Sequence, residues 1–295
     1  IMRILITGVA GFIGSNLADY LLKKGHEIIG IDDLSYGLLE QVPSKVNFHQ
    51  IDILNKDIYH LFDGVKIVFH LAAKNCIADC QLDPVETAKI NITGTVNIFE
   101  ASKQADVKKV IYAESSAVYE KTSSYPSRED DEAPDSFYAI SKIASKLFAD
   151  AYTRFSNLNT IALRYFNVYG PRQDYRRSIP PLMCGTIIKL LKGERPVIYG
   201  DGKKRRDFIY IDDVNRFHEI LINNKSVIRG TYNIGYGLNY SVMEVYETIQ
   251  KLIGTDIIPN YKPDLPGEAF QNLAEISNAR SLGWEPKVNL EEGLK

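Results

Sequence analysis

Three glycines stand between a predicted strand and a predicted helix at the start of the chain. Residues 3–7, RILIT, are a short apolar run with β-branched side chains, and residues 12–25, FIGSNLADYLLKKG, carry apolar residues at helical spacing. Gly8, Gly11 and Gly14 lie in the TGVAGFIG stretch that joins them. Such a turn lets the backbone approach a pyrophosphate at the helix N-terminus, where free N–H groups favour anions. The glycine triplet alone is weak evidence, because a tight turn also favours glycine.

Strands and helices alternate through residues 1–170. The expected strands are residues 3–7, 26–32, 46–52, 65–72, 107–116 and 159–170, and the expected helices include 12–25, 88–105 and 138–155. This alternation predicts parallel βαβ units, and therefore an α/β fold with a Rossmann-type, doubly wound parallel sheet. Beyond residue 170, loops rich in Gly, Pro and Arg surround the helical stretch LMCGTIIKLLKG, which predicts a smaller second domain.

The composition is ordinary for a globular chain. Of 295 residues, 45% are hydrophobic and 24% charged, and the net charge is −2. This balance gives no reason to expect nucleic acid or a membrane as a partner. No apolar run reaches the roughly 18 residues of a membrane span, and the first apolar run meets glycine too soon for a signal peptide. The helical pattern of LEEGLK runs to Lys295, so we expect a further C-terminal piece.

The cysteines bear on location and on metal binding. Cys76, Cys80 and Cys184 are an odd and sparse set, which favours a cytoplasmic protein over a disulfide framework. Cys76 and Cys80 have no histidine nearby, and their spacing differs from that of usual zinc sites. We therefore expect no metal.

Acidic residues after the second and third strands indicate how a dinucleotide is held. Asp32 follows Gly14 by eighteen residues, and a carboxylate there can bind both hydroxyls of the adenosine ribose and repel a 2′-phosphate. No Lys or Arg stands in the DDLSYG stretch that also holds Asp33, so NAD is favoured over NADP. Asp52 and Ile53 can hold the adenine, although a turn-capping role suits Asp52 nearly as well.

Tyr138 and Lys142 lie four residues apart in YAISK and therefore share one face of a helix. A Lys ammonium near a phenol stabilises the phenolate, which makes a tyrosine usable as a general base near neutral pH. The pattern Y-x-x-x-K is common by chance and usually marks a surface helix face. Coincidence is a poor explanation here, because the same chain holds the glycine turn, Asp32 and the serines of SSAVYE (115–120).

These stretches together resemble the extended short-chain dehydrogenase/reductase family, in particular the NAD-dependent nucleotide-sugar epimerases of the UDP-glucose 4-epimerase type. The resemblance is carried by TGVAGFIG (7–14), DDLS (32–35), HLAA (70–73), NITGT (91–95), SSAVY (115–119), YAISK (138–142), RYFNVYGPRQ (164–173), GDGKKRRDFIYIDD (200–213) and YNIG (232–235). These stretches are very specific for the family and less specific for the substrate.

The resemblance implies a domain organisation and an oligomeric state. Residues 1–170, with a contribution from 208–235, would form the NAD-binding Rossmann domain. Residues 171–207 and 236–295 would form the domain that binds the nucleotide sugar. Relatives form homodimers through two helices, which here correspond to about 88–103 and 138–155.

The resemblance also implies a reaction in which NAD stays bound throughout. Tyr138 would take the proton from the sugar 4-hydroxyl, Lys142 would bind the nicotinamide ribose and tune Tyr138, and Ser115 would hydrogen-bond the 4-oxygen. Hydride would pass to NAD, and the 4-keto sugar would turn over and take the hydride back on its other face.

The remaining site residues are also implied by the resemblance. The expected cofactor site comprises Gly8, Gly11, Phe12, Ile13, Gly14, Asp32, Asp33, Asp52, Ile53, Leu71, Ala72, Ala73, Asn91, Tyr138 and Lys142. The expected substrate site comprises Lys74, Ser115, Ser116, Asn167, Arg172, Arg206 and Asn272. Arg206 would pair with the diphosphate through its planar fork of donors, and Arg172 is a weaker candidate for the same task. We interpret Lys203, Lys204 and Arg205 as a solvated charge run.

The SSA stretch bears on the type of reaction. Relatives that dehydrate the sugar carry an Asp-Glu pair directly after the position of Ser115, and decarboxylating relatives carry a Glu at the second of these positions. Here the two positions are Ser116 and Ala117, neither of which is an acid. The stretch therefore favours epimerisation.

Several departures from the family pattern concern the substrate pocket. Leu265 stands in LPGE where relatives carry a diphosphate-binding Arg, Glu120 replaces the Gly of VYG, and Cys76 and Cys80 occur where relatives often have Ser. Asn272 occupies a position that is a larger Tyr in enzymes strict for glucose and galactose. We therefore hypothesise that N-acetylated sugars are accepted as well.

Three other functions stay open on the sequence. The chain could be an NAD-dependent dehydrogenase or reductase that releases its product, or an idle NAD-binding sensor. It could also be an epimerase for a UDP-uronic acid, an alternative to which the basic Lys74 contributes.

Overall fold

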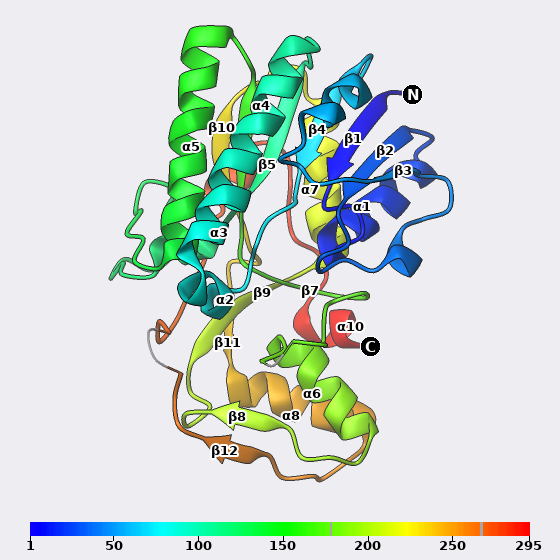
Figure 1. Ribbon diagram of the computed structural model, residues 1–295. Coiled ribbons are helices and arrows are strands. Elements are labelled where there is room, and N and C mark those ends of the chain that lie inside the picture. The colour runs from blue at the N-terminus through cyan, green and yellow to red at the C-terminus, as the bar shows by residue number, and fades with distance from the viewer. Residues whose placement is uncertain (178, 266–267) are drawn as a thin grey trace.

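A parallel sheet dominates the computed structural model, which describes residues 1–177, 179–265 and 268–295. Among these residues, seven strands form the sheet in the upper part of Figure 1. In spatial order they are β10 (Gly230–Ile234), β6 (Thr160–Tyr165), β5 (Lys109–Ser115), β4 (Ile67–His70), β1 (Arg3–Thr7), β2 (Glu27–Asp32) and β3 (Asn47–Gln50). All neighbouring strands are parallel. The predicted α/β fold with a doubly wound, Rossmann-type sheet is confirmed.

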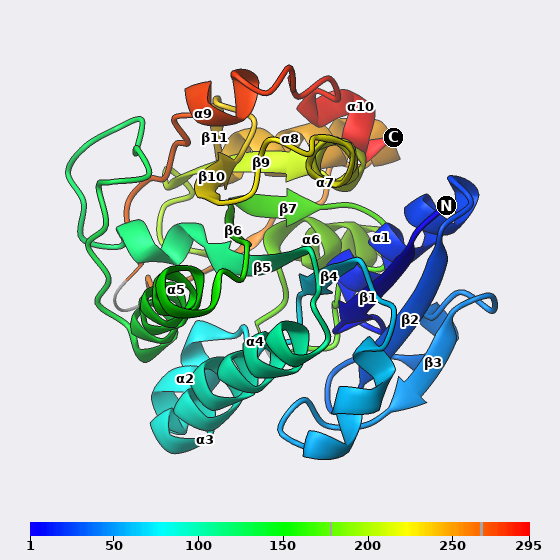
Figure 2. The same cartoon turned by 90° about the horizontal axis from the view of Figure 1, so that it is seen from above.

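Helices cover both faces of this sheet (Figure 2). One face carries α4 (Thr95–Gln104) and α5 (Phe137–Ser156), with α2 (Ile77–Leu82) and α3 (Pro84–Ala88) beside them, and the other carries α1 (Phe12–Lys23) and α7 (Ile211–Asn223). On α7 the buried Val214, Phe217 and Leu221 recur at helical spacing, so this helix packs an apolar stripe on the sheet. Each face thus has its own apolar core.

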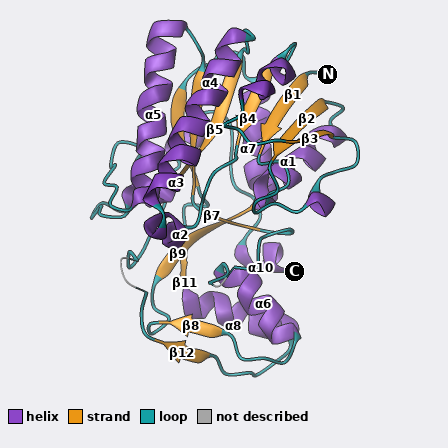
Figure 3. Cartoon of the chain, in the orientation of Figure 1, coloured by secondary structure: helices purple, strands orange, loops and turns teal. Residues whose placement is uncertain are grey.

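A smaller part of the molecule lies below the carboxyl ends of the strands (Figure 3). It contains the strands β7 (Asn167–Tyr169), β8 (Val197–Tyr199), β9 (Arg205–Tyr210), β11 (Asn239–Ser241) and β12 (Asn260–Lys262), and the helices α6 (Leu182–Leu191), α8 (Val242–Ile253) and α10 (Leu290–Leu294). The short helix α9 (Ser277–Arg280) packs against β10 of the large sheet instead. The helix α8 begins with a capping box made by Ser241 and Glu244 and ends at Gly254, whose φ is 77°. A third apolar cluster fills this part.

Three of the crossings between the smaller part and the large sheet are short, and the chain also crosses before and after α9. Phe166 alone separates β6 from β7, and residues 235–238 separate β10 from β11. The third crossing has no intervening residue, because α7 begins at Ile211 directly after β9.

Two predicted elements are wrong in detail. The expected strand 159–170 is two strands. Phe166 donates its N–H to the Ile234 carbonyl at 2.9 Å, and the chain then enters the three-stranded sheet β11-β9-β7. The expected helix 88–105 begins as a π-helical segment, η3 (Lys89–Gly94), before it continues as α4.

Short 3₁₀ segments complete the structure, namely η1 (Leu39–Gln41), η2 (Lys56–Phe62) and η4 (Ser116–Tyr119). None of the helices in the described part of the chain is both long and apolar enough to span a membrane.

Candidate active site

Two cavities meet at the carboxyl end of the large sheet. The first has a volume of about 350 Å³ and the second, in the smaller part, about 520 Å³. Val168, Gln173 and Pro181 line both cavities, so the two form one continuous groove. The predicted residues that line the first are Gly8, Gly11, Phe12, Ile13, Gly14, Asp32, Asp33, Asp52, Ile53, Leu71, Ala72, Ala73, Lys74, Ser115, Tyr138 and Lys142, and those that line the second are Asn167 and Arg206.

The glycine turn leaves no room for side chains at two positions. Gly8 has a φ of 71°, and a Cβ there would lie 2.8 Å from the backbone nitrogen of Ala72. A Cβ on Gly14 would lie 2.1 Å from the carbonyl oxygen of Gly8. The turn therefore packs tightly against the end of β4 and exposes backbone to the cavity at the start of α1.

Asp32 presents a buried carboxylate at the end of β2. Its Oδ2 accepts the N–H of Ala10 at 3.0 Å, and its Oδ1 accepts the N–H of Leu34 at 2.9 Å. Burial raises the pKa of Asp32 above its ordinary value, while these two N–H groups oppose the rise. Each carboxylate oxygen has further lone pairs, which suits the two hydroxyls of a ribose.

The neighbourhood of the expected adenine site contains one interaction that the sequence did not reveal. Asp52 lines the cavity and also accepts the N–H of Leu54 at 2.8 Å, so the turn-capping role is present as well. Arg176 comes from a distant loop and donates to the Tyr36 carbonyl at 2.6 Å, and it pairs with Asp174 at 2.9 Å. Arg176 and Tyr36 are 140 residues apart in the chain, so no local sequence pattern predicts this contact.

Asn91 supports the cavity from behind. Its Oδ1 accepts the N–H of Lys74 at 2.8 Å, and its Nδ2 donates to the Lys74 carbonyl and to the Ser141 hydroxyl, each at 3.0 Å. The side chain is buried within the π-helical segment η3. Asn91 therefore fixes the backbone that follows β4 and, among the described contacts, does not itself line either cavity.

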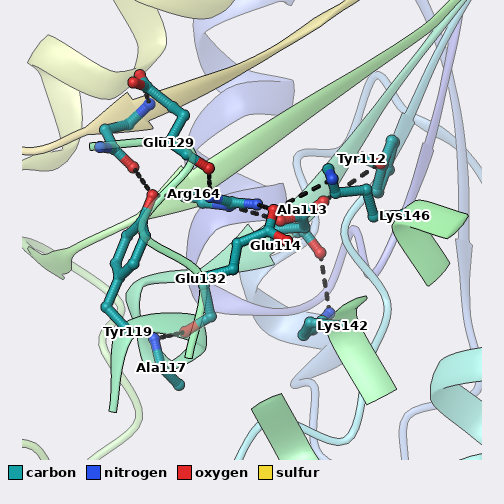
Figure 4. Close-up of polar contacts among 12 residues, drawn as sticks. Tyr112, Ala113, Glu114, Ala117, Tyr119, Glu129, Glu132, Lys142, Lys146 and Arg164 are labelled. Atoms are coloured by element: carbon teal, nitrogen blue, oxygen red, sulfur yellow. Dashed lines mark hydrogen bonds and ion pairs between the residues drawn. The ribbon is translucent and has the colours of Figure 1, made fainter. Parts of the chain in front are cut away.

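Ser115, Tyr138 and Lys142 meet at one end of the first cavity. Ser115 ends β5 and accepts the N–H of Ala117 at 3.2 Å, which leaves its own O–H available as a donor. Lys142 lies one helical turn after Tyr138 on α5, and its Nζ is 5.7 Å from the centroid of the Tyr138 ring. The Lys142 Nζ donates to the Ala113 carbonyl at 2.9 Å, which anchors the ammonium to β5 (Figure 4).

Burial shifts the pKa values of these two groups in opposite directions, because it disfavours both the phenolate and the ammonium. It raises the pKa of Tyr138 to about 12, while a hydrogen bond with Ser115 and the positive charge of Arg177 lower it. It lowers the pKa of Lys142 to about 8, while the negative charge of Glu114 raises it. Arg177, which also lines this cavity and donates to Asn75 at 2.8 Å, was missed in the sequence.

A buried ion pair forms the wall behind these residues (Figure 4). Arg164 on β6 pairs with Glu114 on β5 at 2.8 Å, and both side chains are fully buried. The Arg164 guanidinium also donates to the Tyr119 hydroxyl at 2.8 Å and to Glu132. Its remaining contact is the Glu129 carbonyl at 2.5 Å, so one guanidinium joins β5, η4 and the loop before α5.

The second cavity contains more positive charge than the sequence indicated. Arg206 lines it, with Nη2 3.7 Å from Glu268. Lys204, interpreted above as part of a solvated run, also lines it and is only 11% exposed, because Glu268 and Asp264 pair with it. The solvated interpretation is wrong for Lys204 and right for Lys203, which is 77% exposed.

Four predicted residues lie outside the lining of both cavities in the described structure, namely Asn91, Ser116, Arg172 and Asn272. Arg172 pairs with Asp19 on α1. Asn272 accepts the N–H of Asp207 at 2.8 Å and the Nδ2–H of Asn167 at 3.1 Å, so it positions a cavity residue. Pro266 and Gly267 of LPGE lie outside the described residues, whereas Leu265 lines the second cavity. Within the described ranges, no three His, Cys, Asp or Glu side chains gather as a metal would require.

The groove can be compared with known proteins. Residues 4–235 match the model of the NAD-dependent epimerase/dehydratase family. A putative UDP-glucose 4-epimerase of Methanocaldococcus jannaschii is 36% identical over 296 residues, which cover 99% of this chain and 96% of that protein.

Two solved structures are similar along nearly the whole chain. A UDP-N-acetylglucosamine 4-epimerase of Methanobrevibacter ruminantium has a TM-score of 0.94 at 30% identity, covering 99% of this chain and 97% of that one. A UDP-glucuronic acid 4-epimerase of Bacillus cereus, in complex with UDP-glucuronic acid and NAD, has a TM-score of 0.91 at 32% identity, covering 99% and 96%.

The cofactor suggested by these matches fits the residues present. The first cavity offers a backbone-exposing glycine turn at the start of α1 and the buried Asp32 carboxylate, which are the features that a dinucleotide requires. The chain therefore belongs to the NAD-dependent epimerase/dehydratase family, within the extended short-chain dehydrogenases/reductases, and its cofactor is NAD.

Proposed function

We propose that this chain catalyses the 4-epimerisation of a UDP-hexose. The observation that supports it most is the meeting of Ser115, Tyr138 and Lys142 at one end of the NAD cavity, beside a second cavity that contains Arg206. When bound, NAD supplies the hydride acceptor and returns the hydride to the other face of the sugar.

Tyr138 is the proposed proton-transfer group. Its phenolate takes the proton from the sugar 4-hydroxyl while C4 loses hydride, and the phenol returns a proton to the oxygen when the hydride comes back. Ser115 donates its O–H to the same oxygen, and the Lys142 ammonium stabilises the phenolate. Ser116 and Ala117 offer no carboxyl group for dehydration or decarboxylation.

We propose UDP-glucose/UDP-galactose and UDP-N-acetylglucosamine/UDP-N-acetylgalactosamine as the substrate pairs. Arg206 is the proposed diphosphate ligand, with Asn167 and Lys204 beside it in the second cavity. Asn272 lies behind Asn167 and outside the described cavity lining, so no bulky side chain enters the cavity from this position, which supports acceptance of the 2-acetamido group.

A UDP-uronic acid is a second candidate substrate. Arg177 lines the same cavity as Tyr138, and the nearly buried Lys74 lines it too. Two cations near the reacting end of the groove would favour a sugar that carries a carboxylate.

The domain roles and the location follow as proposals. We propose that residues 1–170, with 208–235, bind NAD and that residues 171–207 and 236–295 bind the nucleotide sugar. The three cysteines are free thiols, which supports the cytoplasm as the location.

Incubation of the purified protein with each UDP-sugar and no added cofactor tests the reaction. We expect chromatography to reveal the 4-epimer of UDP-glucose and of UDP-N-acetylglucosamine, because NAD stays bound through the cycle. Conversion of UDP-glucuronic acid alone would select the second candidate. Accumulation of NADH after NAD is added, without epimer, would indicate a dehydrogenase that releases its product. No turnover of these sugars would contradict the proposal and favour a sensor.

We also propose a homodimer, formed through α5 as the resemblance implies and through α2 and α3 in place of the expected segment 88–103, which is fully described and has no large exposed apolar side chain. Leu82 is 85% exposed, Val85 78% and Leu147 62%, and these three helices are in contact with one another. Burial of such side chains against a second copy would remove apolar surface from water.

Leu147→Glu is expected to convert the dimer to a monomer, because it places a charge in this apolar face. The measurement is light scattering coupled to size-exclusion chromatography. Leu191→Glu is the matched control, since Leu191 is 68% exposed on α6, and it should leave the dimer intact. A monomeric wild type, or a dimeric Leu147→Glu variant, would contradict the proposed interface.

A further inference from the structure

Glu120 stands where the resemblance leads us to expect glycine, and its carboxylate has three hydrogen-bond partners. Oε2 accepts the N–H of Asp135 at 3.0 Å and the N–H of Ser136 at 2.8 Å. Oε1 accepts the hydroxyl of Ser136 at 2.8 Å. Both oxygens of the carboxylate are thus hydrogen-bonded within the protein.

These partners belong to the beginning of the helix that carries the catalytic tyrosine. Ser136 is the N-cap of α5, and its hydroxyl oxygen accepts the N–H of Ala139 at 3.1 Å while its hydrogen goes to Glu120. A negative charge is favourable at the N-terminus of a helix of 20 residues. Tyr138 is the second residue of this helix, so Glu120 acts on the turn that holds it.

Glu120 itself belongs to the turn that begins at Ser115. Ser115 is the N-cap of the 3₁₀ segment η4, and Glu120 is its C-terminal cap, with its N–H donated to the Ala117 carbonyl at 3.1 Å. The Tyr119 hydroxyl of this segment accepts a hydrogen bond from the Arg164 guanidinium at 2.8 Å (Figure 4). The turn is therefore bonded to Arg164 through Tyr119 and to α5 through Glu120.

Other contacts join this turn to the residues just before α5. The Lys121 N–H donates to the Ala133 carbonyl at 3.1 Å, and the Ala133 N–H donates to the Val118 carbonyl at 2.8 Å. Arg164 bonds both Tyr119 and Glu132, and the Lys121–Asp135 ion pair at 3.2 Å is 64% and 60% exposed. Exposed ion pairs contribute little to stability. Among these described contacts, the carboxylate of Glu120 is the charged group that bonds the N-cap residue of α5 itself, and charged hydrogen bonds are shorter and stronger than neutral ones.

We propose that Glu120 is a positioning residue that sets the separation between the Ser115 and Tyr138 hydroxyls by holding the turn after Ser115 against the N-terminus of α5. It contacts neither of these side chains in the described structure and acts through Ser136 and η4. The inference rests on the proposed function, in which Ser115 and Tyr138 are the proton-transfer groups.

The hydrogen bonds of Glu120 and its negative charge have opposite expected effects on the reaction. The groups that face Tyr138 are Ser115, Cys80, Arg177, Glu120 and, on its own helix, Lys142. The negative charge of Glu120 raises the pKa of Tyr138 and so disfavours the phenolate. Removal of the charge alone would therefore help the reaction at low pH, whereas removal of the hydrogen bonds would harm it at every pH.

Two variants of the full chain, each with bound NAD, separate these effects. Glu120→Gln keeps an oxygen that can accept the N–H groups, so kcat should stay close to the wild-type value and the rising part of its pH profile should move to lower pH. Glu120→Ala removes the acceptors, and kcat should fall by roughly 10- to 100-fold with little change in KM, because misplaced reacting groups slow the chemical step.

Glu292→Ala is the matched control. Glu292 accepts the N–H of Asn289 at 3.2 Å at the start of α10, so this variant also loses a helix cap but should keep its kcat. A Glu120→Ala variant with wild-type kcat well below its melting temperature would overturn the inference, even if its Tm fell.

Crystal structures of the wild type and of Glu120→Ala distinguish a failure of this inference from a failure of the proposed function. If the wild type epimerises no UDP-sugar, the proposed function is wrong, and the Ser115 Oγ to Tyr138 Oη distance decides the inference by itself. We expect this distance to be longer in Glu120→Ala than in the wild type. An unchanged distance would overturn the inference.

Discussion

Tyr138→Phe is expected to slow epimerisation by roughly 10²- to 10⁴-fold, the usual contribution of a positioned acid or base. The change removes one oxygen from a buried ring and leaves Ser115, Lys142 and the cavity in place, so KM should change little. The measurement is kcat from the rate at which the 4-epimer appears. Tyr152→Phe is the control, because Tyr152 lies on the same helix but bonds Glu100 at 3.0 Å, and its kcat should equal the wild-type value.

The pH profile of the wild type gives an independent check on the same residue. In the free chain the pKa of Lys142 is about 8 and that of Tyr138 about 12, so the pair loses its first proton near the lower value. The phenolate–ammonium form and the phenol–amine form contain the same number of protons. The rate should therefore rise with pH through the first ionisation and fall when the second proton leaves. A rate that falls through the first ionisation would contradict Tyr138 as the base.

Arg164→Met is expected to lower the free energy of unfolding by about 3–5 kcal/mol, because it leaves the buried Glu114 carboxylate without its cation. Denaturant unfolding followed by circular dichroism measures this loss. The double variant Arg164→Met/Glu114→Gln should recover part of it, since the uncompensated charge is gone. A loss in the single variant of less than about 1 kcal/mol would indicate that water reaches this pair.

The loss in Arg164→Met should also depend on pH. Burial already raises the pKa of Glu114, and Arg164 opposes that rise. Without Arg164 the pKa of Glu114 in the folded state lies further above its unfolded value, so the folded state binds more protons in that interval. Stability of the variant should therefore fall as pH rises through the interval, and the difference from the wild type should be smaller at low pH. An equal difference at all pH values would contradict a charged Glu114.

The sequence predicted best where a local pattern determines the structure. The strand 3–7, the glycine turn and the helix after it all occur as expected, because apolar periodicity and glycine act within a few residues. The strand 159–170 was wrong because hydrophobicity does not reveal which sheet a strand joins. Phe166 is apolar like its neighbours, yet its N–H bonds the Ile234 carbonyl and β7 joins another sheet.

The sequence predicted the reacting groups of the candidate site better than the residues that hold them in place. Ser115, Tyr138 and Lys142 carry recognisable chemistry at recognisable spacing. Glu114 and Arg164 do not, because they are paired only through the register of β5 and β6, in which they are direct neighbours. Glu120 was seen only as a departure from the family pattern, since its partners lie fifteen and sixteen residues later in the chain.

The three short crossings between the large sheet and the smaller part limit how the groove can open. One residue separates β6 from β7, four residues separate β10 from β11, and β9 leads directly into α7. A hinge would have to bend these three crossings together with the two C-terminal segments that cross before and after α9, and none of the three includes a flexible linker of the kind that separates mobile domains. The walls of the groove should thus keep a nearly constant spacing throughout turnover. In the proposed reaction, the keto sugar would then rotate within a compartment of fixed width, with the diphosphate end as its pivot.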